Sequence, residues 1–109
     1  MTKPRLLIEN AIFLDEEKGQ YIAGKLIQFD LCLIFKSLPT TMWVDGHETP
    51  MPEDSLAIKC SEYFEDEHLI VCPLFACQFN APANAYLNEK LNKEGVPLQL
   101  IAPNGGFVQ

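Results

Sequence analysis

Residues 21–35, with the sequence Tyr-Ile-Ala-Gly-Lys-Leu-Ile-Gln-Phe-Asp-Leu-Cys-Leu-Ile-Phe, decide the fold class of this chain. Every odd-numbered position except Lys25 is apolar, whereas the even-numbered positions mix apolar side chains with Gly24, Gln28 and Asp30. Side chains of a strand point alternately to its two faces, so this spacing of two predicts one long strand with a fully buried face and a mixed face. Gly24 is where that strand is expected to bend or to carry a bulge. The stretch therefore indicates a β-sheet protein.

Shorter runs with the same spacing predict further strands on either side of this stretch. Residues 5–14 alternate in the same way and reach the long strand through a charged turn at 15–19, which predicts an antiparallel hairpin. Residues 56–60 alternate again. Residues 69–72 are apolar on both parities, which is typical of a strand buried on both faces. The chain up to Asn80 is therefore expected to be mainly β-structure.

The apolar spacing changes to three and four residues after Asn80, which predicts a helix near residues 82–94. Asn80 or Asn84 is a suitable N-cap, and Gly95 stands where helices commonly end. Residues 96–101 predict a last strand, which a β-α-β crossover would place parallel to an earlier strand. The expected fold class is α+β, a mainly antiparallel β-sheet of about five to six strands with the one helix packed on it; a small β-barrel with one helix is the alternative.

Length and composition indicate a single globular domain, residues 1–109. Of the 109 residues, 48% are apolar and 21% are charged, which are ordinary values for a folded protein. Fifteen acidic residues against eight basic ones give a formal net charge of −7. Nucleic-acid backbones are bound by clusters of Lys and Arg, so direct binding to nucleic acid is disfavoured.

The sequence shows no pattern of an export signal or of a membrane span. The apolar run at 6–8 is interrupted by Glu9, and the uncharged stretch 69–88 is interrupted by prolines and asparagines. All four cysteines lie in apolar, strand-like runs, where free cysteine packs as a small hydrophobic side chain. They are Cys32, Cys60, Cys72 and Cys77. We therefore expect reduced thiols and a cytoplasmic protein that binds no membrane.

No group of side chains in the sequence predicts catalysis, a metal site or a cofactor. Cys72 and Cys77 are too far apart for a tight zinc knuckle, and further ligands would have to come from elsewhere in the chain. His47 and His68 are the only candidate bases for a cysteine or serine nucleophile, and neither is grouped with one. We therefore expect no enzyme. A small cysteine-dependent enzyme is a further hypothesis, which the reactivity of the thiols would test.

Two surface features are candidates for binding a partner protein. Four carboxylates gather between two predicted strands, and they are Glu62, Glu65, Asp66 and Glu67. Met42 and Trp43 lie in a proline-rich segment, and aromatic and methionine side chains at such an edge are common binding anchors. A solvated acidic loop and a tryptophan that closes one end of the core are the structural alternatives.

These features favour a non-enzymatic protein–protein interaction module, such as an adaptor, an inhibitor or an accessory subunit. The mixed face of the long strand carries Ile22 and Leu26, more apolar surface than a solvated face requires. We expect that face to be covered by the helix or by another chain, for example in a homodimer. The alternative function is acidic mimicry, in which carboxylates imitate nucleic-acid phosphates and occupy a basic nucleic-acid-binding protein. The expected partner is another protein in either case.

Overall fold

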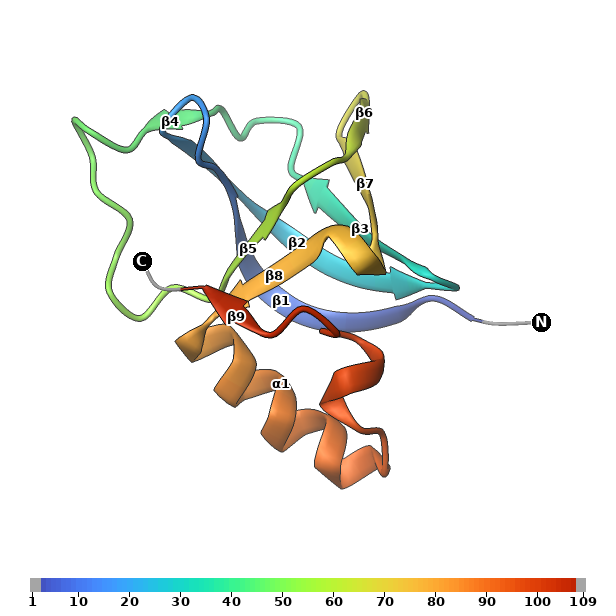
Figure 1. Ribbon diagram of the computed structural model, residues 1–109. Coiled ribbons are helices and arrows are strands. Elements are labelled where there is room, and N and C mark those ends of the chain that lie inside the picture. Colours follow the sequence, from blue (N-terminus) through green and yellow to red (C-terminus); the bar gives the residue numbers. More distant parts are fainter. Residues whose placement is uncertain (1–2, 108–109) are drawn as a thin grey trace.

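Nine strands form one mixed, mostly antiparallel sheet in residues 3–107, the part of the chain that this computed structural model describes (Figure 1). The strands are β1 (Arg5–Asp15), β2 (Gln20–Phe29), β3 (Cys32–Ser37), β4 (Val44–Asp45), β5 (Ala57–Cys60), β6 (Phe64–Asp66), β7 (Leu69–Pro73), β8 (Cys77–Asn80) and β9 (Gly106–Phe107). The helices of the described chain are α1 (Ala81–Glu94) and two short 3₁₀ helices, η1 (Leu74–Ala76) and η2 (Leu98–Leu100).

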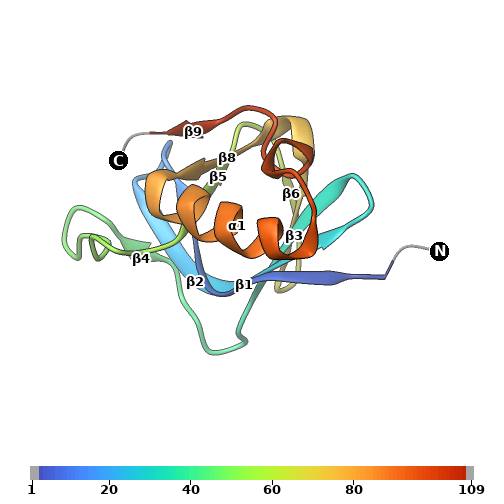
Figure 2. The same cartoon turned by 90° about the horizontal axis from the view of Figure 1, so that it is seen from below.

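The sheet is open, with the strand order β6-β7-β3-β2-β1-β5-β8-β9 and with β4 paired to β2. Two pairs, β1 with β5 and β8 with β9, are parallel, and the others are antiparallel. Figure 2 views the molecule from the side of α1, which lies across one end of the curled sheet and packs against β5, β8 and β9. The predicted α+β class is confirmed, and the sheet stays open instead of closing into the alternative barrel. More strands form than expected because several consist of only two or three residues.

The stretch predicted as one long strand is a hairpin, so that prediction is wrong. Phe29 pairs with Cys32 across a two-residue turn, in which Asp30 takes a left-handed conformation with φ of 54°. Asp is one of the few residues that tolerate this conformation. Each even-numbered residue of β2 pairs with an odd-numbered residue of β3, as Leu26 does with Phe35, and paired residues point to the same face. The buried face therefore carries even-numbered residues in β2 and odd-numbered residues in β3. The two sheet faces are therefore exchanged at the turn.

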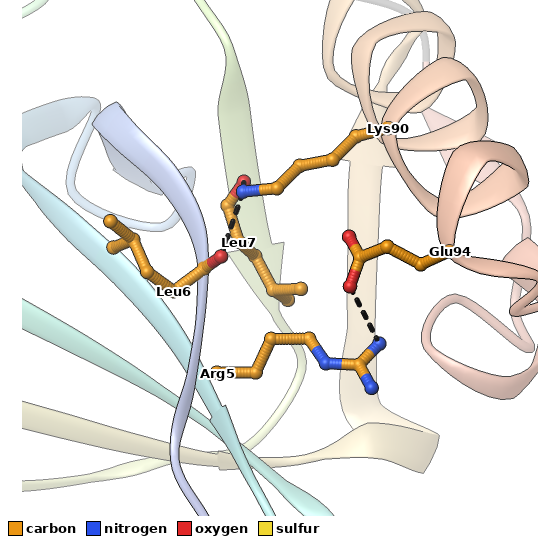
Figure 3. Close-up of polar contacts among 5 residues, drawn as sticks. All are labelled: Arg5, Leu6, Leu7, Lys90 and Glu94. Atoms are coloured by element: carbon orange, nitrogen blue, oxygen red, sulfur yellow. Dashed lines mark hydrogen bonds and ion pairs between the residues drawn. The ribbon is translucent and has the colours of Figure 1, made fainter.

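The first strand is irregular, and α1 binds it where it departs from the ladder. The register shifts between Leu6 and Ile8, and Leu7 and Ile8 are both buried. Figure 3 shows Lys90 of α1 reaching this point, where its ammonium donates to the carbonyls of Leu6 at 2.8 Å and Leu7 at 3.0 Å. The helix is thus hydrogen-bonded to the backbone of β1 at the point where its register shifts.

The predicted helix is confirmed together with its ends. Asn80 is the N-cap, because its Oδ1 accepts the backbone N–H of Ala83 at 3.0 Å. Gly95 ends the helix with φ of 74°, which glycine adopts without the strain that a Cβ would add. The side chains of Ala83, Leu87 and Leu91 recur every four residues and are fully buried against the sheet. The spacing of apolar residues at every third or fourth position therefore predicts which face of α1 packs against the sheet.

The crossover after α1 is parallel, but its strand is not the predicted one. Residues 96–101 form no strand; instead, the Leu98 carbonyl accepts the N–H groups of Ile101 and Ala102, which makes a tight turn around η2. The strand that follows is β9, which pairs in parallel with β8. None of the helices in residues 3–107 has the length and apolar character that crossing a bilayer requires.

Candidate functional site

The outer face of the sheet, opposite the buried core, carries a row of apolar side chains that crosses five strands. Each member of the row is paired directly with the next one, and paired residues point to the same face. In order from β1 to β6 the members are Leu6, Ile27, Ile34, Val71 and Phe64. Strands lie about 4.8 Å apart, so the row is about 19 Å long. We call these five residues the outer row.

Both ends of the outer row are accessible to solvent. Phe64 is 63% exposed and Leu6 is 41% exposed, and the three members between them are half-buried. Their neighbours along each strand point inward and belong to the buried core, as Leu26, Phe35 and Ile70 do. The sheet is therefore apolar on both faces in this region, although only the inner face is covered within the described residues.

Charged side chains flank the outer row on one side. Residues two positions along each strand share its face, which gives a second row in which Lys25 pairs with Lys36, Lys36 with Leu69, and Leu69 with Asp66. The positive charges thus lie on β2 and β3, and the negative charge lies on β6. Lys25 also makes an exposed ion pair with Glu9 at 3.4 Å.

A pocket of 580 Å³ extends the outer face beyond these charges. Its walls come from β1, from β2 and from the loop before β5, and they include Ile12, Ala23 and Leu56. Leu38, which is 53% exposed, stands at the same pocket. The apolar outer surface therefore continues past Lys25 instead of ending at the outer row.

The sequence-predicted partner residues on the long strand are not on this face. Ile22 is 5% exposed and Leu26 is 1% exposed, and both belong to the core cluster together with side chains of α1. Of the two covers expected for their face, the helix of the same chain is the one observed, so these two side chains are not available to a partner. The turn after Phe29 allows the even-numbered residues of β2 and the odd-numbered residues of β3 to share this inner face. Ile34, another even-numbered residue of the same stretch, does lie in the outer row.

Of the two anchor candidates in the proline-rich segment, Met42 and Trp43, only Met42 is largely exposed. Met42 is 79% exposed. Trp43 is half-buried and packs edge-to-face on Phe13, with ring centroids 6.0 Å apart. The structural alternative for Trp43, closing one end of the core, therefore describes its position, and Met42 stands beside it without such a contact in the core cluster.

The predicted acidic residues Glu62, Glu65, Asp66 and Glu67 are all exposed, on β6 and on the turns beside it. The structure brings further carboxylates to them from the β1–β2 turn. Burial raises the pKa of Tyr63, and the negative charges of Asp15, Glu65 and Glu17 raise that pKa further. Tyr63 is thus the point where two acidic segments that are distant in sequence meet.

Three of the cysteines converge, contrary to the sequence interpretation. Cys60 of β5, Cys72 of β7 and Cys77 of β8 have Sγ atoms that all lie within 4.8 Å of one another. Cys60 and Cys72 form a disulfide, so the prediction of four reduced thiols is wrong for this pair. The sheet curls until β7 and β5 come together, although three other strands separate them in the sheet order. Sequence spacing carries no signal of that approach.

The free thiol of this cluster does not resemble an activated nucleophile. Burial raises the pKa of Cys77 to about 12, and the neighbouring Cys32 contributes to the rise. A catalytic cysteine requires a lowered pKa and a base beside it. The two histidines are exposed residues of turns: the N–H of His47 donates to Asp45 at 2.8 Å, and the carbonyl of His68 accepts from Ser37.

Comparisons with protein-family models, with curated proteins and with solved structures found no match for this chain.

Proposed function

We propose that this chain is a non-enzymatic protein–protein interaction module and that it binds through the outer row. The single observation that supports this function is a continuous line of five apolar side chains on the sheet face that residues 3–107 leave uncovered. Solvated faces of antiparallel sheets usually carry polar side chains, and extended apolar patches on soluble proteins mark interaction sites. Phe64 at the end of the row has the size and exposure of an anchor residue.

The partner that fits the flanking charges is a second copy of the same chain. In a face-to-face dimer whose two-fold axis runs parallel to the strands between β3 and β7, the order β2-β3-β7-β6 of one copy faces the reverse order in the other. Ile27 then meets Phe64 of the second copy. Lys25 meets Asp66 of the second copy, so opposite charges face each other. A two-fold axis that runs along the outer row would instead place Lys25 of one copy opposite Phe29 of the other. The ammonium of Lys25 would then be desolvated without an opposite charge to compensate.

The test is the mass of the particle in solution, measured by sedimentation equilibrium over a range of protein concentrations. The proposal predicts a dimer whose Kd rises at least tenfold, about 1.4 kcal/mol, in Phe64→Ser. The matched control is Phe75→Ser, which removes the same type of side chain at nearly the same exposure, 65%, outside the outer row, and should leave the Kd unchanged. A wild-type chain that stays monomeric at every concentration would refute self-association through this face.

A charge exchange tests the orientation of the two copies. Lys25→Glu alone and Asp66→Lys alone each place like charges opposite each other and should weaken the dimer. The double variant restores opposite charges and should recover most of the lost affinity. If the double variant is weaker than either single one, the proposed axis is incorrect. The exposed ion pair of Lys25 with Glu9 contributes little to folding, so the single variants should stay folded.

The meeting of acidic segments at Tyr63 favours a second candidate function, acidic mimicry. The carboxylates of Asp15, Glu17 and Glu65 act together on one side chain, as closely spaced phosphates would act on a basic surface. The probe is a basic single-strand-binding protein held on labelled nucleic acid, from which this chain should displace the label. Reversing the charges of all four predicted carboxylates, Glu62, Glu65, Asp66 and Glu67, should abolish displacement. Displacement that survives the reversal, or that is insensitive to salt, would end this hypothesis.

A further inference from the structure

The three converging cysteines lie where the curled sheet comes back on itself. Cys60 and Cys77 are paired across β5 and β8, and their Sγ atoms are 3.6 Å apart. Cys72 comes from β7, on the other side of this junction. Three different strands therefore deliver one sulfur atom each to a single point, and the strands themselves fix the positions of the three Cα atoms.

The spacing of the sulfur atoms fits a thiolate-bound metal ion. Zinc binds cysteine sulfur at about 2.3 Å with tetrahedral angles, which places two sulfur ligands about 3.8 Å apart. The three Sγ atoms lie within 4.8 Å of one another, and those of Cys60 and Cys77 are 3.6 Å apart. Small rotations of the side chains would bring all three to a common distance from one ion once no disulfide joins two of them.

A second observation, independent of the thiols, points to a cation at this place. A pocket of 320 Å³ has Cys60 in its wall and is also lined by Asp15, Glu16 and Glu17 of the β1–β2 turn. Carboxylates at the entrance of a pocket attract cations, and a metal site needs such an entry path. Lys59 at the same pocket forms its ion pair with Glu16. Lys59 therefore does not neutralise the negative charges of Asp15 and Glu17.

We propose that the reduced chain binds one Zn²⁺ ion through the thiolates of Cys60, Cys72 and Cys77, and that the Cys60–Cys72 disulfide is the metal-free, oxidised state of the same site. The fourth ligand is water, which reaches the ion through the acidic pocket. A buried thiol gives up its proton when a metal ion replaces it, so the burial that makes Cys77 a poor nucleophile is compatible with its role as a ligand.

The chemical steps balance with a thiol reductant. Two molecules of a low-molecular-weight thiol reduce the Cys60–Cys72 disulfide to two thiols and become one disulfide themselves. Zn²⁺ then displaces three protons from the three thiols as the three zinc–sulfur bonds form. In reverse, a low-molecular-weight disulfide takes two electrons from Cys60 and Cys72, and the protein disulfide forms. Water supplies three protons, of which two complete the two low-molecular-weight thiols that result and one returns to Cys77 as the ion leaves.

The test titrates Co²⁺ and then Zn²⁺ into the full chain, once after reduction by excess thiol with the thiol then removed under nitrogen, and once in the oxidised form. The reduced chain should give the intense near-ultraviolet absorption of cobalt–thiolate bonds at one ion per chain, and Zn²⁺ should displace it. The oxidised chain should give no such absorption. A reduced chain without cobalt–thiolate absorption, or with equal absorption before and after reduction, would overturn the proposal.

Two serine variants separate the ligands from a merely nearby thiol. Cys77→Ser keeps the Cys60–Cys72 disulfide, so its folding can be verified in the oxidised form by circular dichroism, and after reduction it should bind Zn²⁺ at least about 100-fold more weakly. Cys32→Ser is the matched control, because Cys32 lies outside the group of three, and it should bind one ion with wild-type affinity. Equal Zn²⁺ affinity in Cys77→Ser and wild type, or loss of the ion in Cys32→Ser, would overturn the assignment of the three ligands.

Discussion

Asn80 holds three parts of the molecule together, and replacing it by alanine is predicted to destabilise the fold strongly. Its Oδ1 accepts the N–H of Ala83 at 3.0 Å and the N–H of Ala57 at 3.1 Å, and its Nδ2 donates to the carbonyl of Ser55 at 2.9 Å. The side chain is 1% exposed. It therefore joins the start of α1 to β5 and to the loop before β5.

The magnitude follows from what Asn80→Ala leaves behind. Loss of an N-cap costs about 1 kcal/mol. The N–H of Ala57 is then left without a partner in a fully buried residue, which costs about 1–3 kcal/mol more, and the half-buried carbonyl of Ser55 adds to this. These two losses together amount to about 2–4 kcal/mol, a large part of the stability of a domain of this size.

The assay is urea unfolding of the oxidised chain, followed by the fluorescence of its one tryptophan, Trp43, at a fixed protein concentration. The matched control is Asn84→Ala in the same helix. Asn84 donates only at 3.4 Å, and its Oδ1 is buried without a partner among residues 3–107, so alanine should cost less than about 1 kcal/mol. If Asn80→Ala loses no more stability than Asn84→Ala, the role assigned to Asn80 is refuted.

Three further predictions concern other parts of the fold. Lys90→Met removes two hydrogen bonds from α1 to the irregular part of β1 and should cost about 1–2 kcal/mol in the same assay, whereas Lys93→Met, whose ion pair is fully in solvent, should cost almost nothing; equal effects would contradict this role of Lys90. Gly24→Ala places a Cβ in steric overlap with the backbone oxygen of Lys36 and should cost about 1–3 kcal/mol. An unchanged urea midpoint would contradict the close approach of β2 and β3 at this point. The raised pKa of Tyr63 contributes stability that is present below the ordinary pKa of 10.0 and is lost as the pH rises through the higher pKa of the folded state. The variant Tyr63→Phe has no group that titrates there, so it should lose less stability than wild type on going to alkaline pH. Parallel profiles of stability against pH in the two proteins would contradict the shift.

Features set by neighbours in sequence were predictable. The helix was placed within one residue of its start because Asn80 and Gly95 are local signals that act on the backbone next to them. The pairing of β1 with β2 was likewise expected from the charged turn between them. Both predictions depend on interactions within a few residues, where pattern and propensity agree.

The outer row was missed because one turn was not recognised. Asp30 ends β2 without glycine or proline beside it, and the apolar run continues at once in Leu31. With the turn placed there, the pairing of β2 with β3 follows by counting, and Ile27 and Ile34 fall on the same outer face. A one-residue error in register exchanges the faces of a strand, which is why Ile22 was assigned to the wrong one.

The cysteine cluster depends on the shape of the whole sheet. Cys60 and Cys72 meet because the sheet curls over several strands, and that curvature is the sum of small twists that no single residue signals. The alternation of side chains along a strand predicts which face of the sheet a cysteine lies on. It does not predict that two cysteines from strands far apart in the sheet order will meet when the sheet curls. A contact of this kind becomes visible only in three dimensions.

The most direct test of the proposed function is a contact that a single chain is unable to make. Ile27 and Phe64 lie three strand spacings apart in one sheet, about 14 Å, beyond the range of a nuclear Overhauser effect. In a mixture of isotope-labelled and unlabelled chains, a filtered spectrum should show magnetisation transfer from the Ile27 methyl groups to the Phe64 ring of the second copy. A dimer without this transfer, or no dimer at all, would contradict binding through the outer row.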